Sequence, residues 1–525
     1  MEYCQASKPR DRRRRRRRAR AVARTSRIET TRAWPHEMVV SLLAAVHAFA
    51  VVYSPSHGLC ARGHPRHTCM SATRAAAQDL RNWVEEHGGA VNNVLAGPTQ
   101  HGLGLLATEA IKNGDVAVRV PKECLIYHPN DEALLELHNS IPEDFWAARL
   151  ALLLLAERSK GEASPMKRYL DTLPASFTVP LFWTPKAIST LKYPTVQQRL
   201  LSQAKFIQAF ATEQLTTERE AGIFAGRHID ADAFGWAVAA SSSRAVRVDG
   251  HPRLLCPFID LGNHAAPGAA SCELRGTQAG GVELVALRDI ELGEELTYDY
   301  GARSNDDFLL EYGFLPAAPN RHDDVALAWA DGAVLQTAIS TAGLDRLSLD
   351  DAWRRAALRT ALPANLADVR VTPRGVDRYA MAACRIAAAS DPAALRAADG
   401  GMRPLLAAGS EVTALRLAAA MAAMALTSLP EAPDEEGSAD TEGAPCDAGE
   451  ELAGAFLAQK RALCSAALAH VTDRIKALRS GEARAELRGT SKGRTARGVR
   501  KTSASRKGMS SGRNREKAGG GFGKR

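Results

Sequence analysis

The spacing of apolar and polar residues divides this chain into a strand-rich part and helical parts. Residues 115–121 alternate apolar and polar positions, as a half-buried strand does. Residues 90–96 and 103–108 have the composition of short strands on either side of a glycine turn. From residue 131 to about 240 the apolar residues instead recur at helical spacing. The pattern therefore predicts a sheet followed by a helical region.

Two segments show the helical signal most clearly, and strands return after them. Residues 145–157 are apolar around most of the helical surface, which predicts a buried helix. Residues 196–215 repeat apolar positions with the spacing of an amphipathic helix. Short strands are predicted at 254–261, 282–287 and 295–299.

The chain becomes rich in alanine, leucine and arginine after residue 316, and its pattern is helical. Helices are predicted over 352–362, 376–389 and 452–478. Residues 431–451 are acidic and contain proline, glycine and serine, which predicts a disordered insert. The tail, 479–525, is basic and has almost no core-forming residues, so we expect it to be disordered.

The length of 525 residues allows two or three domains. The net charge of +9 is concentrated at the ends, in an unbroken arginine run at 12–18 and in the tail. The remaining core is not strongly basic, so specific nucleic-acid binding is not predicted. The nine cysteines form no CxxC or CxC pair, which argues against a zinc site and a disulfide scaffold. No metal ligands are predicted.

The N-terminal segment, 1–78, has the composition of a targeting sequence. An apolar stretch at 38–53 follows the arginines, and His47 interrupts it. It is too short for a membrane span, so no stable span is predicted in the mature protein. Residues 39–78 contain no Asp or Glu, as in transit peptides. Together the two parts resemble the bipartite presequence of algae with secondary plastids and predict a plastid location. The alternatives are an untargeted disordered segment and a cytoplasmic or nuclear protein.

Three short motifs carry the candidate chemistry. They are Gly-Leu-Gly-Leu at 102–105, Asp-Leu-Gly-Asn-His at 260–264, and Gly-Glu-Glu-Leu-Thr-Tyr-Asp-Tyr-Gly at 293–301. In this order, with a tyrosine closing the last motif, they resemble a SET-domain protein methyltransferase. The extension Ser-Asn-Asp-Asp-Phe-Leu-Leu-Glu-Tyr-Gly-Phe at 304–314 resembles the plant Rubisco large-subunit lysine methyltransferase branch of that family, as does the segment 164–174.

The resemblance implies an α+β fold. A SET domain built of short β-sheets with a pseudoknot would carry a helical insert, and an all-α substrate-binding domain would follow it. The implied division is 1–78 for the targeting segment, 79–316 for the SET domain with its insert at about 122–240, 317–478 for the helical domain, and 479–525 for the tail.

The glycine motif offers backbone with no side chains in the way of a ligand. The resemblance assigns Gly102, Leu103 and Gly104 to the methionine part of S-adenosylmethionine. The alternative is an ordinary glycine turn. The motif lacks the third glycine and the following helix of a dinucleotide fingerprint, so NAD binding is not predicted.

Further cofactor contacts are implied by the resemblance. Asn263 offers both a donor and an acceptor to the amino-acid end of the cofactor, and His264 follows it. Asp260 belongs to the same motif. Arg244, which precedes the motif, can pair with a carboxylate, and Phe314 resembles an aromatic that stacks near the adenine. The alternatives are a capping aspartate, a core histidine and a surface arginine.

Tyr300 is the predicted catalytic residue. In SET enzymes the tyrosine that closes the third motif directs its hydroxyl at the methyl-transfer centre. Tyr298 is predicted to contact substrate, with a place in the core of the strand as the alternative.

Three positions favour lysine as the methyl acceptor. The SET branch that methylates histidine in actin has an Asn two residues after the motif arginine and a Trp before the motif aspartate, where this chain has Val246 and Ile259. Tyr312 matches a tyrosine that borders the lysine channel of the Rubisco branch. An apolar, aromatic channel favours the neutral amine that reacts. Val246 stands where the Rubisco branch usually has Phe, so a wider channel and a different substrate are expected.

The sequence thus predicts a monomeric, S-adenosylmethionine-dependent protein-lysine N-methyltransferase that acts on a non-histone protein. Protein-histidine methylation by the same branch is one alternative. A non-catalytic SET-type module that binds a partner protein is another. A chromatin-associated protein that uses the basic ends is the third, and the lack of aromatic residues interleaved in the tail argues against it.

Overall fold

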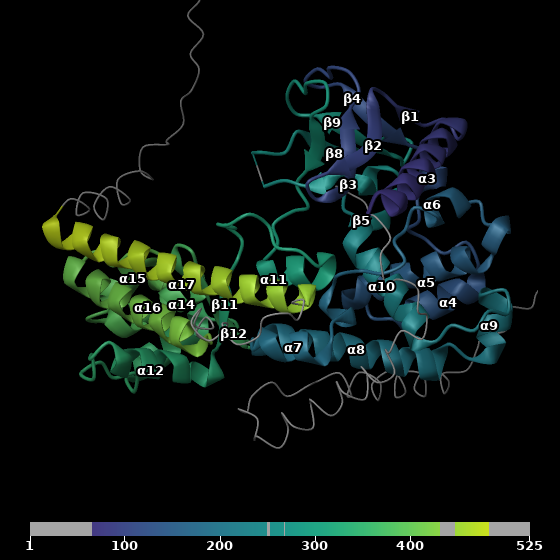
Figure 1. The fold of residues 1–525 in the computed structure, drawn as a ribbon. Coiled ribbons are helices and arrows are strands. Elements are labelled where there is room, and N and C mark those ends of the chain that lie inside the picture. Colours follow the sequence, from purple (N-terminus) through teal and green to yellow (C-terminus); the bar gives the residue numbers. More distant parts are fainter. Residues whose placement is uncertain (1–65, 249–252, 267, 431–446, 482–525) are drawn as a thin grey trace, which may run out of the picture.

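A computed structural model describes residues 66–248, 253–266, 268–430 and 447–481. Most of the predicted targeting segment, most of the acidic insert and nearly all of the basic tail lie outside the described residues. Figure 1 shows a sheet with helix α3 beside it, a group of helices below the sheet, and a second helical group that contains α12 and α14–α17.

The main sheet has the strand order β1-β4-β9-β8-β10-β3-β2, and β7 pairs with β10. Its strands are β1 (Ala90–Val91), β2 (Val94–Thr99), β3 (Gly102–Ala107), β4 (Val116–Val120), β7 (Asn263–His264), β8 (Cys272–Gly276), β9 (Val282–Ala286) and β10 (Glu295–Tyr298). Most pairs are antiparallel, but β7 and β8 run parallel to β10. The short strand at 90–96 was expected to be continuous. It is instead split, because Asn93 adopts a positive φ of 56° between β1 and β2.

Helices precede the sheet and form the insert. They are α3 (Arg66–Glu86), α4 (Glu132–Ser140), α5 (Trp146–Ser159), α6 (Lys167–Leu170), α7 (Pro185–Leu191), α8 (Pro194–Gln214), α9 (Thr217–Ile223) and α10 (Ala231–Arg244). Asp131 and Asp230 begin α4 and α10 by accepting hydrogen bonds from backbone N–H groups in the first turn. Helix α5 is buried around most of its surface, as predicted. It packs against α10 under the sheet region.

Single turns of 3-10 helix join several of these elements. In the described residues they lie at Lys122–Cys124, Glu143–Phe145, Gly161–Ala163, Pro180–Phe182, Ile259–Leu261, Ala330–Gly332 and Asp399–Gly401. The strand predicted at 254–261 is only partly correct, because one of these turns occupies Ile259–Leu261. Strand β6 (Leu254–Leu255) pairs with β5 (Ala245–Val246), and the chain then turns at Pro257 and Phe258. Phe258 adopts a φ of 70°, which ends the strand and leads into the helical turn before Asn263.

The C-terminal region is helical, as expected. Its helices are α12 (Ala333–Thr341), α13 (Ala352–Ala361), α14 (Arg378–Ala388), α15 (Pro392–Ala397), α16 (Ala408–Ser428) and α17 (Ala448–Ser480). Before it, after the last strand of the main sheet, come the short helix α11 (Asn305–Asp307) and a π-helical turn, η6 (Phe308–Tyr312). A small antiparallel sheet is also present, made of β11 (Val325–Ala328), β12 (Asp368–Thr372) and β13 (Gly375–Val376). The alternation of buried and exposed residues in β12 is the strand signal that the prediction of helices overlooked.

Helix α16 is long and apolar enough, by length and composition alone, to cross a membrane. Half of that apolar window is buried inside the protein, where α16 packs against α14 and α17. A core helix of a globular protein has the same properties.

Helix α17 joins the two parts of the molecule. Phe456 and Cys464 on its first half are buried in the same apolar core as the main-sheet strands and the helices between residues 132 and 244. Val471 and Leu478 on its second half are buried in a second core, formed with α14 and α16. Figure 1 shows the helix running along the C-terminal group and reaching α11 and α7. The domain boundary at 316–317 stays a prediction, and α17 is the element that contacts both sides of it.

Candidate active site

The three motifs, far apart in the sequence, meet at strand β10. Strand β3 lies antiparallel to β10 and places Leu105 opposite Leu296. Strand β7 lies parallel to β10 and places Asn263 opposite Thr297. The fold thus brings the glycine motif, the Asn-His motif and the tyrosine motif to one place, as their combination predicted.

Asn263 is held against the glycine motif. Its side-chain nitrogen lies 2.7 Å from Oε1 of Glu295, 3.2 Å from Oγ1 of Thr99 and 3.4 Å from the carbonyl oxygen of Leu103. A Cβ atom at Gly104 would come within 2.6 Å of both Glu295 Oε1 and the Thr99 methyl group, and within 2.8 Å of the Asn263 nitrogen. Glycine at 104 is therefore what allows these polar side chains to converge on the strand.

His264 contacts the backbone of the predicted catalytic residue. The Tyr300 N–H donates a hydrogen bond of 3.2 Å to Nδ1 of His264. Nδ1 can accept only when it carries no proton, so this contact requires the neutral ring with its proton on Nε2. Burial lowers the pKa of His264, which favours that neutral form at pH 7.

The Tyr300 hydroxyl is fixed by the second motif. It donates a hydrogen bond of 2.8 Å to the carbonyl oxygen of Gly262. A Cβ atom at Gly262 would lie 2.9 Å from the Tyr298 ring, so a larger residue there would displace Tyr298 and the carbonyl. Burial raises the pKa of Tyr300, so its hydroxyl keeps its proton and acts by hydrogen bonding.

Aromatic rings surround the Tyr300 side chain. The centroid distances are 5.0 Å for Tyr300–Tyr312, 5.1 Å for Tyr298–Tyr300, 5.1 Å for His264–Tyr300, 4.8 Å for His264–Phe308, 5.3 Å for Phe308–Phe314 and 6.4 Å for His264–Phe314. Burial raises the pKa of Tyr312 to about 12, so this ring is also neutral at physiological pH. The cluster forms an uncharged wall next to the tyrosine hydroxyl.

Arg244 is placed by a buried carboxylate. Asp260 is fully buried, and its Oδ2 accepts a hydrogen bond of 2.9 Å from the Tyr169 hydroxyl. Nη1 of Arg244 lies 3.4 Å from the Asp260 carbonyl oxygen and 3.5 Å from Oδ2. Burial raises the pKa of Asp260, while Arg244 and Tyr169 oppose that rise. The geometry supports Asp260 as the residue that orients Arg244, rather than as a direct ligand contact.

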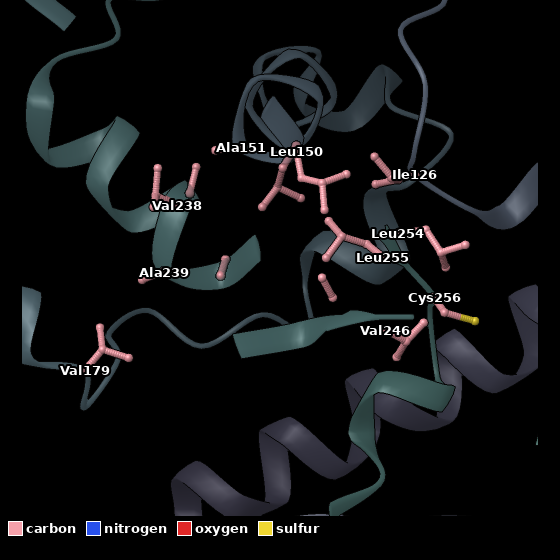
Figure 2. Packing of buried hydrophobic residues seen from close by; sticks show 14 of the residues in the cluster. Ile126, Leu150, Ala151, Val179, Val238, Ala239, Val246, Leu254, Leu255 and Cys256 are labelled. Carbon is pink, nitrogen blue, oxygen red and sulfur yellow. The ribbon is translucent and has the colours of Figure 1, made fainter. Parts of the chain in front are cut away.

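The two apolar positions that were predicted to select lysine are buried. Val246 lies in β5 opposite Leu254, and Ile259 lies in the helical turn that precedes the Asn-His motif. Figure 2 shows Val246 beside Leu254, Leu255 and Cys256 in a packed apolar cluster. Their place in the channel wall stays a prediction.

The remaining residues of the glycine motif lie at the start of β3, next to the turn from β2. Gly102 is exposed with a φ of 100°, and Leu103 is half-buried beside it. The predictions missed Thr99, Glu295, Tyr169 and Phe308. Glu295, Tyr169 and Phe308 lie within the segments 293–301, 164–174 and 304–314 that carry the resemblance, and that position was the signal for them.

In the part of the chain that the structure describes, no group of three or more His, Cys, Asp or Glu residues is arranged to hold a metal ion.

The SET domain family matches residues 102–301, and these residues have the strands and motifs described above. The chain therefore contains a SET domain. A solved structure of the SET domain of LSMT bound to lysine and AdoHcy matches 77% of this chain and 93% of its own, with a TM-score of 0.57 and 19% identity. That similarity supports the fold.

Two curated relatives are similar in sequence. The chloroplastic Rubisco large-subunit N-methyltransferase of Pisum sativum is 28% identical over 47% of this chain and 53% of its own length. The actin-histidine N-methyltransferase of Drosophila melanogaster is 28% identical over 42% of this chain and 45% of its own. The chain thus spans about half the length of the curated relatives that it matches.

Proposed function

We propose that this protein is an S-adenosylmethionine-dependent protein-lysine N-methyltransferase whose substrate is a non-histone protein. The observation that carries the proposal is the Tyr300 hydroxyl, held by the Gly262 carbonyl at the junction of the three SET motifs and walled by aromatic rings. The similarity to both lysine and histidine methyltransferases supports methyl transfer to a protein and leaves the acceptor to be tested.

The charged, hydrogen-bonding and aromatic groups of the site fit S-adenosylmethionine. Arg244 can pair with a carboxylate, and Glu295 beside Asn263 can accept from an ammonium group. His264 and Phe314 offer ring faces for a purine. When bound, this cofactor supplies a methyl group on a positively charged sulfur. Each end of the molecule thus has a partner of suitable chemistry on this chain.

The Tyr300 hydroxyl is suited to orient a neutral amine. Because it donates its own proton to Gly262, its oxygen lone pairs remain to accept an N–H from the acceptor. The Gly262 carbonyl beside it is a second acceptor. Two fixed acceptors direct the nitrogen lone pair away from them, which is the orientation that attack on an electrophilic carbon requires.

Apolar residues at the two selecting positions support lysine over histidine. Val246 and Ile259 offer no hydrogen bond to an imidazole, whereas an aliphatic lysine stem needs only apolar surface. Burial among Tyr298, Tyr300 and Tyr312 disfavours the charged ammonium and so favours the reactive amine.

A transfer assay tests the proposal. Tritiated S-adenosylmethionine is incubated with cell extract and either the wild-type protein or Tyr300→Phe, and labelled proteins are identified by mass spectrometry. Methyl-lysine formed only by the wild type is expected. Methyl-histidine would replace the lysine assignment, and cofactor binding without transfer would favour the binding-module alternative.

We further propose that the helical region after residue 316 docks the protein substrate, as the resemblance implies. Helix α17 shares a core with the SET region, so deleting the region would expose apolar surface. The test is therefore made on the substrate. The same extract is cut with a glutamate-specific protease, which leaves lysines intact. A Michaelis constant at least tenfold higher for peptides than for intact protein is expected, and equal constants would reject docking.

A plastid location is proposed from the acid-free basic segment before residue 79 and is supported by the chloroplastic name of the Pisum sativum relative. A fluorescent reporter fused to residues 1–78 should enter plastids. A reporter that stays in the cytosol or enters the nucleus would reject the targeting role.

A further inference from the structure

A buried lysine of helix α17 pairs with the segment that follows the catalytic motif. Lys460 is fully buried, and its Nζ lies 2.5 Å from Oδ1 of Asp306 and 2.6 Å from Oδ1 of Asp323. It also donates a hydrogen bond of 2.6 Å to the carbonyl oxygen of Asp324. Burial lowers the pKa of Lys460, but Asp306 and Asp323 outweigh this effect and raise it overall. Lys460 is therefore charged in the folded protein.

Gln459, the neighbouring residue on α17, forms hydrogen bonds with the same segment. Oε1 of Gln459 accepts a hydrogen bond of 2.6 Å from the Asn305 side chain. Its nitrogen donates to the carbonyl oxygen of Pro316 at 3.3 Å. The backbone N–H of Asn305 donates to Asp323, which is the carboxylate that Lys460 also contacts. Gln459 and Lys460 thus fix Asn305 and the residues around it to α17.

Hydrogen bonds continue from Asn305 to the catalytic tyrosine. The Asn320 side-chain nitrogen lies 2.9 Å from both the Asn305 side-chain oxygen and the Arg303 carbonyl oxygen. Nε of Arg303 then donates a hydrogen bond of 3.1 Å to the carbonyl oxygen of Tyr300. Arg303 also pairs with Glu311 and lies over the Tyr312 ring. The chain of contacts from α17 to Tyr300 is unbroken.

Covalent connection provides a second route to the site. Asp306 lies two residues before Phe308, which begins the π-helical turn η6. The Phe308 ring packs at a tilt against His264, and Tyr312 at the end of the turn packs at a tilt against Tyr300. Turns of π-helix are uncommon and often stand at functional sites. The contact between Lys460 and Asp306 therefore lies directly before this turn in the chain.

Stability alone is a weak reason for this arrangement. Removing an ammonium group from water is costly, and an apolar residue of similar volume often stabilises a core as well as a buried ion pair does. In some proteins a buried ionic contact is instead retained because it fixes the relative position of the elements that carry its charges. Here those elements are α17 and the segment that presents Phe308 and Tyr312.

We propose that Gln459 and Lys460 of α17 are positioning residues for the SET site: they hold residues 305–312 so that Tyr300, Tyr312 and His264 keep their mutual arrangement. The inference rests on the proposed function, because it takes this site to be the methyl-transfer centre. It adds that the C-terminal helix contributes to the geometry of methyl transfer, apart from any docking of the substrate protein.

Two variants test the proposal. Gln459→Met removes the polar contacts at a half-buried position with little change in volume. The triple variant Lys460→Met, Asp306→Asn and Asp323→Asn removes the charges without leaving an unpaired carboxylate buried. Gln459→Glu keeps the acceptor for Asn305 but loses the donor to Pro316, so it tests the Asn305 contact by itself.

A second buried ion pair supplies the matched control. Arg385 of α14 pairs with Glu411 of α16, with nitrogen–oxygen distances of 2.8–3.1 Å, inside the second core. The pair's further hydrogen bonds, from Arg385 to the Gly401 carbonyl oxygen and from the Leu405 N–H to Glu411, stay within the C-terminal helical group. The control variant is Arg385→Met with Glu411→Gln.

The readouts are the affinity for S-adenosylhomocysteine by calorimetry, the methyl-transfer rate at saturating cofactor, and a thermal melt. We expect Gln459→Met and the triple variant to bind at least fivefold more weakly and to transfer at least tenfold more slowly. The Gln459→Glu variant should stay within twofold of the wild type, as should the control pair even if its melting temperature falls. Wild-type affinity and rate in a folded Gln459→Met variant would overturn the proposal, as would an equal loss in the control pair.

Failure of the proposed function is separable from failure of this inference. A wild-type protein that binds S-adenosylhomocysteine but methylates nothing defeats the proposed function alone. The affinity comparison between the α17 variants and the control pair still decides the positioning role. A wild-type protein that does not bind the nucleoside overturns both.

Discussion

The hydroxyl of Tyr300 donates a hydrogen bond to the carbonyl oxygen of Gly262, with 2.8 Å between the two oxygens. The contact joins two motifs that lie 38 residues apart in the sequence. It fixes both the ring of the tyrosine and the direction of the carbonyl, so a single interaction orients two acceptors for an incoming amine.

Replacing Tyr300 with Phe should therefore reduce turnover far more than cofactor binding. An interaction made mainly in the transition state appears in the rate, and loss of one such polar group costs about 10²-fold or more. The measurement is single-turnover transfer of a tritiated methyl group beside calorimetry with S-adenosylhomocysteine. Tyr379→Phe, on α14 outside the three motifs, is the matched control. Wild-type turnover in folded Tyr300→Phe would refute the catalytic assignment.

Replacing Asn263 or His264 with Ala should weaken cofactor binding. Losing a buried polar partner costs about 1–3 kcal/mol, which is roughly a 5- to 150-fold loss of affinity. Calorimetry on each variant measures the change, and a thermal melt confirms folding. Unchanged affinity in the folded double variant would show that the pocket lies elsewhere.

Cofactor affinity should fall in mild acid because of His264. Burial lowers the pKa of His264 below the ordinary value of about 6.5, so the unfolded chain binds this proton more readily than the folded chain. The contribution of His264 to stability is thus fully present above about pH 6.5 and is lost as the pH falls through the folded pKa. Protonation also removes the acceptor for the Tyr300 N–H.

The measurement is a titration of S-adenosylhomocysteine affinity between pH 8 and pH 5. His138, whose pKa is also lowered by burial, lies on α4 outside the motifs and provides the control. His138→Gln should keep the acid loss of affinity, whereas His264→Gln should bind weakly with little dependence on pH. Identical pH profiles for the wild type and His264→Gln would contradict the prediction.

Gly104→Ala should disrupt the site through crowding. The added methyl group would lie 2.6–2.8 Å from Glu295, Thr99 and Asn263, and overpacking of this kind costs about 1–3 kcal/mol. A lower melting temperature and weaker cofactor binding are expected. Gly454→Ala, on α17 with open space around it, should instead be neutral or stabilise the protein by up to about 1 kcal/mol. Equal behaviour of the two variants would argue against the close approach at Gly104.

Ending the chain after Gly481 should leave methyl transfer intact. Helix α17 ends at Ser480, with Gly481 in the left-handed conformation, and every proposed site residue precedes it. Initial rates of the truncated and full-length proteins on the same extract give the comparison. A rate that falls more than about threefold with unchanged melting behaviour would assign the basic tail a part in substrate binding.

Local pattern was enough to predict the long helices and most strands. The apolar spacing of α5 and α8 set their extent within a few residues, because burial of one face requires that periodicity. The motif residues at 102–105, 260–264 and 293–301 could be recognised together because each needs a specific side chain or glycine. Strand β12 was missed because its few residues lie in an alanine-rich helical context, and the run at 254–261 was shortened by the turn at Phe258.

What the sequence determined by itself is the set of groups available for chemistry: a tyrosine, an amide, an imidazole, a guanidinium and a glycine strand. Only the tertiary structure decided that Asp260 is buried behind Arg244 with Tyr169, and that Lys460 of α17 reaches Asp306 beside the site. The first pairing joins residues that are 91 positions apart in the sequence, and the second joins residues more than 150 positions apart. Spacing along a chain records local geometry, whereas contacts of this kind depend on how whole elements pack, so they become visible only in the folded protein.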